Sequence, residues 1–228
     1  MSTEIPPVGR DPGASTKLQI LATEHWSLLA TRSLTYTESL GRVNMFLAIL
    51  SGAVIALALV AQADRFGPTF IAVAIFMLSV VFFTGVATVA RLMALNRDDF
   101  RWVIGMNRLR SAYLEMHPEL EPHFITSQYD DLLGALQTLG IDATGAGRLG
   151  SVGHGLQTLP GMLSVIVAAD AGAIGALAAY AVGLSLLGVL LVGAAAFLLT
   201  AVLIGNSGRR SVRRFDPMTE ARFPTPKK

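Results

Sequence analysis

The chain of 228 residues is 52% hydrophobic and only 15% charged, a composition typical of membrane proteins rather than soluble domains. It has no cysteine, which excludes disulfides, thiol catalysis and cysteine-ligated metals. Its 18 Lys and Arg nearly balance 16 Asp and Glu, and this small net charge gives no reason to expect a nucleic-acid partner.

The first 42 residues are expected to form a tail and a helix. Residues 1–15 are rich in Pro, Gly, Ser and Thr, which predicts a disordered tail. From Thr16 to Arg42, apolar residues recur at helical spacing, which predicts an amphipathic helix in the cytoplasm or at the membrane interface. Such a helix covers the cytoplasmic face or mediates oligomerisation and gating, and His25 beside Trp26 is interpreted as an interface residue. Whether it continues into the next apolar segment stays open.

Residues 43–90 are predicted to form a transmembrane hairpin. Val43 to Ala63 and Phe70 to Ala90 are each about 20 apolar residues long, which is enough to cross the hydrocarbon core. The polar turn Ala63 to Pro68 separates them. The second span has three hydroxyl groups, expected to bond to carbonyls of their own helix, on Ser79, Thr84 and Thr88.

Residues 91–158 are predicted to form a cytoplasmic helical segment that ends in a glycine-rich linker. Leu92 to Glu115 has the pattern of a surface helix, with Trp102 and Tyr113 at the level of the membrane interface. Its arginines are assigned to anionic lipid headgroups or to a protein partner, each contributing about 1 kcal/mol beside such a surface. They are Arg97, Arg101, Arg108 and Arg110.

Two histidines and two glutamates lie together in the segment His117 to His123. Its two prolines prevent the regular helix that would place residues four positions apart on one face, so a polar turn is favoured over a metal site. We expect no metal.

A short helix is expected after this turn. Ser127 to Asp130 has the pattern of a capping box, with Ser127 as the N-cap, and Gly140 is expected to close the helix. Asp130 and Asp131 are therefore interpreted as acids of the first helical turn rather than as a catalytic pair.

The letters of Gly145 to Gly150 match the dinucleotide-binding fingerprint. That fingerprint requires a preceding strand, whereas a helix is expected here. We interpret the segment as a flexible linker and expect no cofactor.

Residues 159–205 are predicted to form a second transmembrane hairpin, divided near Ala181 to Ser185, in which Asp170 is the only charged residue. Small residues share one face of its first helix, which predicts a close helix contact. They are Ala168, Gly172, Gly175, Ala176 and Ala179.

Asp170 lies on the opposite face from these small residues, and two interpretations of it stay open. An ionised carboxylate inside a membrane costs about 2.5 to 3.5 kcal/mol on insertion scales, so it must face protein or water. It is either a proton, cation or pore-lining site, or a structural carboxyl bonded to Ser164, Thr84 or another hydroxyl group.

Residues 206–228 form a basic tail, in which four arginines act as a topology anchor or bind lipid headgroups. They are Arg209, Arg210, Arg213 and Arg214. Of the 18 basic residues, only Arg65 falls in a turn between spans. Because basic flanks stay in the cytoplasm, both termini are predicted there, and the first span is expected to be retained rather than cleaved.

Three segments resemble a family of uncharacterised bacterial integral membrane proteins: Trp26 to Leu34, Met106 to Arg110, and Pro118 to Pro122 followed by Tyr129-Asp130-Asp131. The likeness extends to about Gly140 and implies a bacterial source and a plasma-membrane location, without an activity. The helix before the first hairpin is also similar to SLATT effector domains, which are proposed to act as pores. Those domains have two spans, and no motif residue carries over from them.

Together these patterns predict an all-α polytopic transmembrane bundle of four spans in two hairpins, with a cytoplasmic helical loop and an amphipathic amino-terminal helix. We expect a non-enzymatic protein that forms or regulates an ion or proton pathway at Asp170. The alternative is a scaffold whose cytoplasmic loop docks a soluble partner or anionic lipid. Self-association in the bilayer is also expected.

Overall fold

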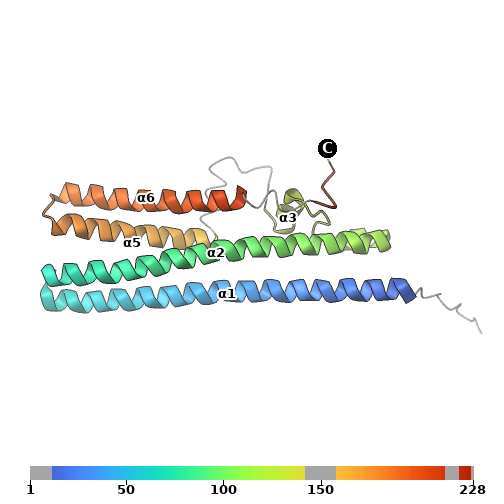
Figure 1. Cartoon of the computed structure of the whole chain (residues 1–228), viewed down its shortest axis with the longest axis horizontal. Helices are drawn as coiled ribbons and strands as arrows, with labels where there is room; N and C mark the ends of the chain where they lie inside the picture. Colours follow the sequence, from blue (N-terminus) through green and yellow to red (C-terminus); the bar gives the residue numbers. More distant parts are fainter. Residues whose placement is uncertain (1–11, 142–157, 214–220, 227–228) are drawn as a thin grey trace, which may run out of the picture. The chain divides into compact units, whose positions relative to one another are not determined.

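The computed structural model describes residues 12–141, 158–213 and 221–226, and within these ranges it contains helices and no strand (Figure 1). Four of the helices are long and apolar enough to cross a membrane. The elements are α1 (Pro12–Asp64), α2 (Pro68–Met116), the 3₁₀-helix η1 (Pro118–His123), α3 (Leu132–Thr138), α5 (Leu159–Ala181) and α6 (Leu186–Arg213).

The predicted hairpins are confirmed, but their helices are longer than the spans. α1 begins at Pro12, within the predicted tail, and runs unbroken through the expected boundary at Arg42. α2 likewise continues from the second span to Met116, so residues 92–115 are not a separate helix. α6 continues past residue 205 to Arg213. Nothing in these sequences interrupts the helices, since the charged residues that mark the ends of the apolar segments are themselves compatible with helix.

The chain divides into two compact units. The bundle unit contains the described residues 35–98 and 158–213, and the polar unit contains residues 12–34, 99–141 and 221–226. Each unit has its own interior, and each is described separately below.

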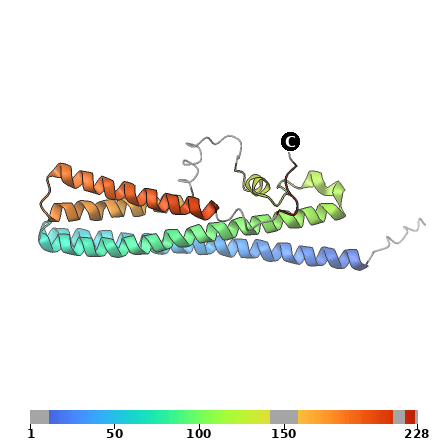
Figure 2. The ribbon, with the colours of Figure 1, turned by 45° about the horizontal axis from the view of Figure 1, so that its top comes forward.

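The bundle unit has an apolar core to which α1, α2 and α5 contribute buried side chains, and Ile204 of α6 packs against it. Figure 2 shows the course of these four helices. The tightest contact is at Gly85 of α2, where a Cβ atom would lie 2.6 Å from Val167 of α5 and 2.9 Å from Phe46 of α1. A glycine is required here because three helices meet at one point. Leu163, Val81 and Val89 continue the core on either side of this contact.

The small-residue face of α5, which the sequence predicted to make a close helix contact, packs against α6. A Cβ atom on Gly172 would lie 3.1 Å from the Gly193 carbonyl oxygen, and one on Gly175 would lie 2.9 Å from Ala196 Cβ. Small side chains thus bring the two backbones close together, which favours van der Waals packing in an apolar surrounding. The two helices lie side by side in Figure 1.

Two tight turns close the hairpins. Between α1 and α2, Asp64 Oδ2 accepts a hydrogen bond from the Phe70 amide at 2.7 Å, and the intervening Arg65 and Phe66 have φ angles of 44° and 63°. Between α5 and α6, Gly183 has a φ of 79°, the left-handed conformation that glycine adopts without a steric penalty. These turns lie where the sequence placed them.

In the polar unit, the first part of α1 packs against the last part of α2. His25 stacks on Tyr113 with ring centroids 5.9 Å apart, and the Arg32 guanidinium bonds to Asp99 at 2.7 Å. The described carboxy-terminal residues 221–226 also belong to this unit. Their backbone amides are bound by Asp130 and Asp131, the two residues just before α3.

Candidate intramembrane acid site

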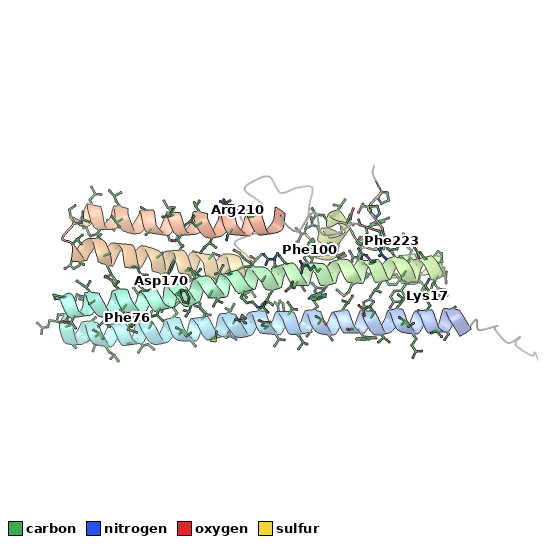
Figure 3. The ribbon with its side chains drawn as sticks, in the orientation of Figure 1. Lys17, Phe76, Phe100, Asp170, Arg210 and Phe223 are labelled. Carbon is green, nitrogen blue, oxygen red and sulfur yellow. The ribbon has the colours of Figure 1, made fainter. Side chains whose placement is uncertain are left out.

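Asp170 is the central residue of α5, eleven residues after Leu159 and eleven before Ala181. At about 1.5 Å per residue, this places it roughly 16 Å from either end of the helix, near the middle of a bilayer core about 30 Å thick. The residue is 8% exposed. It comes from the helix that lies between α2 and α6 in Figure 3.

Asp170 occupies a position where the helical pattern calls for an apolar side chain. Leu163, Val167 and Asp170 follow at spacings of four and three residues, so they share one face of α5. The first two belong to the apolar core, which also includes Phe46 of α1, the residue that lies with Val167 against Gly85. α5 runs antiparallel to α2, so one turn beyond this contact the same interior is supplied by Val81. The carboxyl group therefore lies on the core-facing side of the helix.

Neither carboxylate oxygen of Asp170 has a hydrogen-bond partner among the residues that the structure describes. The hydroxyl groups that sequence reasoning offered as partners are used elsewhere. Ser164 Oγ donates to the Pro160 carbonyl, and Thr84 Oγ1 donates to the Val80 and Val81 carbonyls of its own helix. Ser79 and Thr88 also bond within α2, as expected. The structural interpretation of Asp170 thus lacks the bonds on which it depended.

Buried polar groups normally have a hydrogen-bond partner, and a buried group without one destabilises a fold by about 1–3 kcal/mol. Among the described residues, only Trp102 Nε1 shares this condition, and it lies in the polar unit. A carboxyl that lowers stability in the middle of a membrane helix is a functional candidate, because nothing in the packing requires it. The chemistry it offers is reversible protonation.

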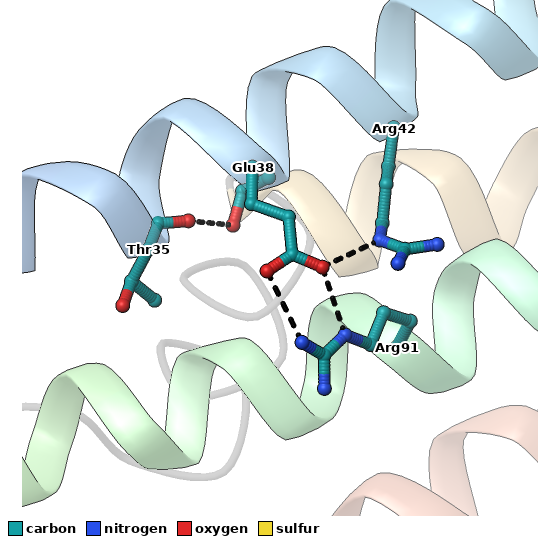
Figure 4. A network of polar contacts seen from close by, with 5 residues as sticks. Thr35, Glu38, Arg42 and Arg91 are labelled. Carbon is teal, nitrogen blue, oxygen red and sulfur yellow. Dashed lines mark hydrogen bonds and ion pairs between the residues drawn. The ribbon is translucent and has the colours of Figure 1, made fainter.

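Glu38, Arg42 and Arg91 form a charged cluster, which Figure 4 shows from close by. By residue number it lies at the opposite end of the bundle unit's first hairpin from the turn. The Glu38 carboxylate accepts hydrogen bonds from Arg91 Nε at 3.0 Å and from Arg42 Nε at 2.8 Å. These bonds, first from Arg91 and then from Arg42, lower the pKa of Glu38. The cluster marks where the apolar segments of α1 and α2 give way to charged sequence.

The polar unit contains the other buried aspartate among the described residues. Asp130 is 0% exposed and accepts hydrogen bonds from Arg108 Nε at 2.8 Å, from the Phe223 amide at 2.7 Å and from the Arg222 amide at 3.0 Å. Its own amide donates to the Phe223 carbonyl. Asp130 is therefore a structural acid that holds the carboxy-terminal segment.

The predicted capping box is wrong, because the helix has its N-cap four residues after Ser127. The N-cap of α3 is Asp131, whose Oδ1 accepts a hydrogen bond from the Gly134 amide at 2.8 Å, while Ser127 Oγ accepts one from the Tyr129 amide. Asp131 also binds the Thr225 amide and hydroxyl group. The bonds from residues 222–225 could not be read from the sequence, because backbone amides supply most of them and any residue except proline has one.

The arginines assigned to lipid or partner contact differ in their surroundings. Arg108 is bound to Asp130, and Arg110 donates to Asn107 Oδ1 at 2.6 Å, so both contribute to the polar unit's interior. Arg97 is half-buried, Arg101 is exposed, and both have partners within the chain. Arg210 is exposed. Arg214 and the side chains of Arg209 and Arg213 lie outside the described residues.

The remaining candidate motifs do not form a site in the described part of the chain. The His117 to His123 segment is a 3₁₀-helix with a pair between His117 and Glu119 at 3.0 Å, and no group of three potential metal ligands occurs in the described ranges. The glycine fingerprint at residues 145–150 lies outside those ranges. No protein-family model, curated protein or solved structure matches this chain.

Proposed function

We propose that this chain is a non-enzymatic integral protein of the bacterial plasma membrane that conducts protons, or regulates their passage, with Asp170 as the proton-binding site. The observation that carries this proposal is the buried Asp170 carboxyl at the centre of α5, both of whose oxygens lack a partner among the described residues. A carboxyl group in that position can exchange a proton only when water reaches it or when a conformational change exposes it to water.

A proton fits this site better than a metal cation. Sodium-like or divalent ions need several oxygen ligands, six to eight for calcium, whereas one carboxyl group supplies two. The known core neighbours along this face, Leu163 and Val167, are apolar. A proton requires a single carboxyl oxygen, and protonation also removes the charge that makes burial costly.

The proposed orientation places both termini in the cytoplasm. Its support is the distribution of basic residues, of which only Arg65 lies in a turn between spans. The Glu38, Arg42 and Arg91 cluster then lies near the cytoplasmic surface, and the turn at residues 64–68 faces outward. With this orientation, Asp170 lies between two aqueous phases of different pH.

Labelling with a hydrophobic carbodiimide tests the proton-binding role directly. Such a reagent partitions into the bilayer and reacts with protonated carboxyl groups there. We expect one modified residue, Asp170, in vesicles that contain the full chain, and no modification of the Asp170→Asn variant. Glu119→Gln, which removes an exposed acid of the polar unit, serves as the matched control and is expected to label like the wild type. Equal labelling of wild type and Asp170→Asn would contradict the proposal.

A second candidate function is a scaffold whose polar unit docks a soluble protein. It is supported by Ile125, whose side chain is 99% exposed, in the same unit as an open pocket of about 390 Å³. Ser111, Leu114, Gln128 and Phe223 are among the residues that line this pocket. Isolated apolar side chains at a surface are common, so the inference rests on the pocket in the same unit as well as on Ile125.

Photo-crosslinking in cells tests the scaffold. A photoreactive residue in place of Ile125 is expected to capture one partner protein, whereas the same residue in place of the exposed Ile20 in α1 is not. Capture of no protein at position 125, or of the same proteins at both positions, would contradict docking at this surface.

A further inference from the structure

The described carboxy-terminal residues 221–226 bind the polar unit as an extended segment without helix. Their exposure alternates, since Ala221, Phe223 and Thr225 are half-buried and the residues that follow each of them are exposed. This alternation is typical of an extended peptide that turns every second side chain toward a receiving surface. None of the six residues is buried, so little apolar surface opposes their release.

Backbone groups of the segment make most of the contacts. Asp130 accepts hydrogen bonds from the Phe223 amide at 2.7 Å and from the Arg222 amide at 3.0 Å. The Asp130 amide donates to the Phe223 carbonyl at 3.1 Å, which pairs the two backbones at one point. Asp131 accepts from the Thr225 amide at 2.9 Å and from the Thr225 hydroxyl group at 2.8 Å. Backbone contacts of this kind give affinity for an extended peptide, and side-chain contacts then give specificity.

The residues Phe223, Pro224 and Thr225 define that specificity. Pro224 has no amide to satisfy and is exposed between two bound residues. The Thr225 hydroxyl group has its own acceptor in Asp131. Phe223 and Pro224 line the open pocket of about 390 Å³ together with Leu114 of α2. The chemistry that this surface recognises is therefore an extended segment with the sequence Phe-Pro-Thr.

Residues 128–131, which receive the segment, are held in place by other parts of the polar unit. Three side chains of α2 bind residues 128–130: Ser111 Oγ donates to the Gln128 carbonyl, Asn107 Nδ2 to the Tyr129 carbonyl and Arg108 Nε to the Asp130 carboxylate. Asp131 accepts the Gly134 amide as the N-cap of α3. None of these bonds uses residues 221–226. The receiving surface is thus pre-organised, and such a surface binds a peptide with a smaller loss of conformational entropy.

We propose that Asp130 and Asp131 form a docking site for an extended Phe-Pro-Thr segment of a soluble partner protein. The chain's own residues 222–225, which we call the tethered segment, occupy the site as a competitor that the partner displaces. This proposal rests on the scaffold candidate for the existence of a partner, and it states how that partner binds. All of its residues belong to the polar unit, so it does not depend on Asp170.

Peptide binding to the full-length chain in detergent tests the docking site. The probe is the fluorescent peptide Ala-Arg-Phe-Pro-Thr-Pro, the sequence of residues 221–226. The open-tail variant, Phe223→Pro/Thr225→Pro, lacks two of the bound amides and the hydroxyl group of the tethered segment. A segment of the same chain competes at an effective concentration of about millimolar, so we expect the open-tail variant to bind the probe at least about tenfold more tightly than the wild type.

Two controls separate this site from non-specific binding. Asp131→Asn in the open-tail variant keeps the oxygen that caps α3 but loses the acceptor of the Thr225 amide, so it should bind the probe about tenfold more weakly. A probe with an N-methylated Phe keeps every side chain but lacks the amide that Asp130 binds, and its binding should weaken by about the same factor.

Two results of the binding experiment would overturn the proposal. One is equal binding of the probe by the wild type and the open-tail variant, which places the probe elsewhere. The other is no binding by an open-tail variant whose tryptophan fluorescence is native, because both tryptophans belong to the polar unit and report its folding.

Hydrogen exchange of the wild type is a second measurement that needs no variant. The Phe223 and Thr225 amides are expected to exchange at least about tenfold faster, after correction for intrinsic rates, than the amide of the buried Asn107 in α2. Such a difference means that the segment opens while the unit stays folded. Equal protection would mean that the segment leaves only when the whole unit unfolds, which contradicts a competitor that a partner displaces.

The remaining outcomes concern the partner. Co-purification of tagged and untagged wild-type chains that excess probe abolishes would identify the occupant as the segment of a second copy, and it would overturn a soluble partner. Probe binding uses the purified chain alone, so its failure is distinguishable from that of the scaffold. Capture at Ile125 without probe binding would leave the scaffold and remove this docking site. Probe binding without capture supports the site and contradicts only docking at the Ile125 surface.

Discussion

Among the described residues, each of the two units buries one aspartate, and the two side chains have opposite surroundings. Asp130 of the polar unit accepts three hydrogen bonds, one from a guanidinium group and two from backbone amides. Asp170 of the bundle unit accepts none from the described residues. A buried acid with full hydrogen bonding stabilises a fold, whereas one without partners weakens it. The comparison therefore gives Asp130 a structural role and leaves Asp170 as the candidate for the proposed proton-binding role.

Removing the satisfied acid is expected to have the largest effect. Asp130→Ala leaves the Arg108 guanidinium and two amides without their acceptor, at a cost of about 3–5 kcal/mol in unfolding free energy. Both tryptophans, Trp26 and Trp102, belong to the polar unit, so urea unfolding followed by tryptophan fluorescence reports this unit alone. Glu119→Gln is the exposed control and is expected to change little. If the urea midpoint of Asp130→Ala equalled that of the wild type, Asp130 would not stabilise the polar unit, and the contrast with Asp170 would fail.

Removing the unsatisfied acid is expected to act in the opposite direction. Asp170→Leu replaces a buried carboxyl without partners by an apolar side chain, which should stabilise the bundle by about 2 kcal/mol. Thermal unfolding in detergent, followed by circular dichroism, measures this as a raised Tm. A lowered Tm would show that Asp170 has stabilising partners, and the contrast with Asp130 would then fail.

The packing of α2 against α1 and α5 in the bundle core can be tested at Gly85. Gly85→Ala places a methyl group 2.6 Å from Val167 and 2.9 Å from Phe46, and overpacking of this kind costs about 1–2 kcal/mol. Gly52→Ala in α1 is the matched control, because no atom lies within 4 Å of the new methyl group. We expect a lower Tm for the first variant only. Equal Tm values would mean that α5 does not pack on α2 in this way.

Acid is expected to loosen the polar unit through Asp131. Burial acts to raise the pKa of Asp131, but hydrogen bonds from the Gly134 and Thr225 amides and from the Thr225 hydroxyl group outweigh it, so the pKa is lowered. The stabilisation is therefore complete above the unfolded-state pKa, about 3.9 for an aspartate, and is lost as pH falls through the lower folded-state value.

Hydrogen exchange at the Thr225 amide measures this acid effect. We expect protection near neutral pH and faster opening, after correction for intrinsic exchange, as Asp131 becomes protonated. In Asp131→Asn the side chain no longer ionises, so the part of the pH dependence that belongs to Asp131 should disappear. The same pH dependence in both proteins would assign it to other groups.

The two hairpins and the isolated Asp170 could be predicted from the sequence. The length of an apolar segment and a single charge within it are local signals. The small residues Gly172 and Gly175 likewise predicted a close helix contact, and the structure shows that its partner is α6. The unbroken course of α1 could not be predicted, since the charged residues near Arg42 also suit a helix boundary. In the structure Glu38 bonds to both Arg42 and Arg91, which lets charged residues follow the apolar segments without ending either helix.

The attachment of residues 222–225 could not be predicted either. Asp130 and Phe223 are far apart in the sequence, and the bonds between them use backbone groups that leave no pattern in side-chain types. What the sequence does contain is a pair of aspartates, and a pair of acids has several possible roles. Only the contacts distinguish the N-cap Asp131 from the fully buried Asp130.

Proton flux into liposomes that contain the purified chain tests the role of Asp170 most directly. With an imposed membrane potential, the wild type is predicted to carry protons, Asp170→Asn to carry none while inserting and assembling normally, and Asp170→Glu to retain flux because it keeps an ionisable carboxyl group. Wild-type liposomes without flux at any applied potential, or Asp170→Asn liposomes that conduct as well as the wild type, would contradict a proton pathway at Asp170.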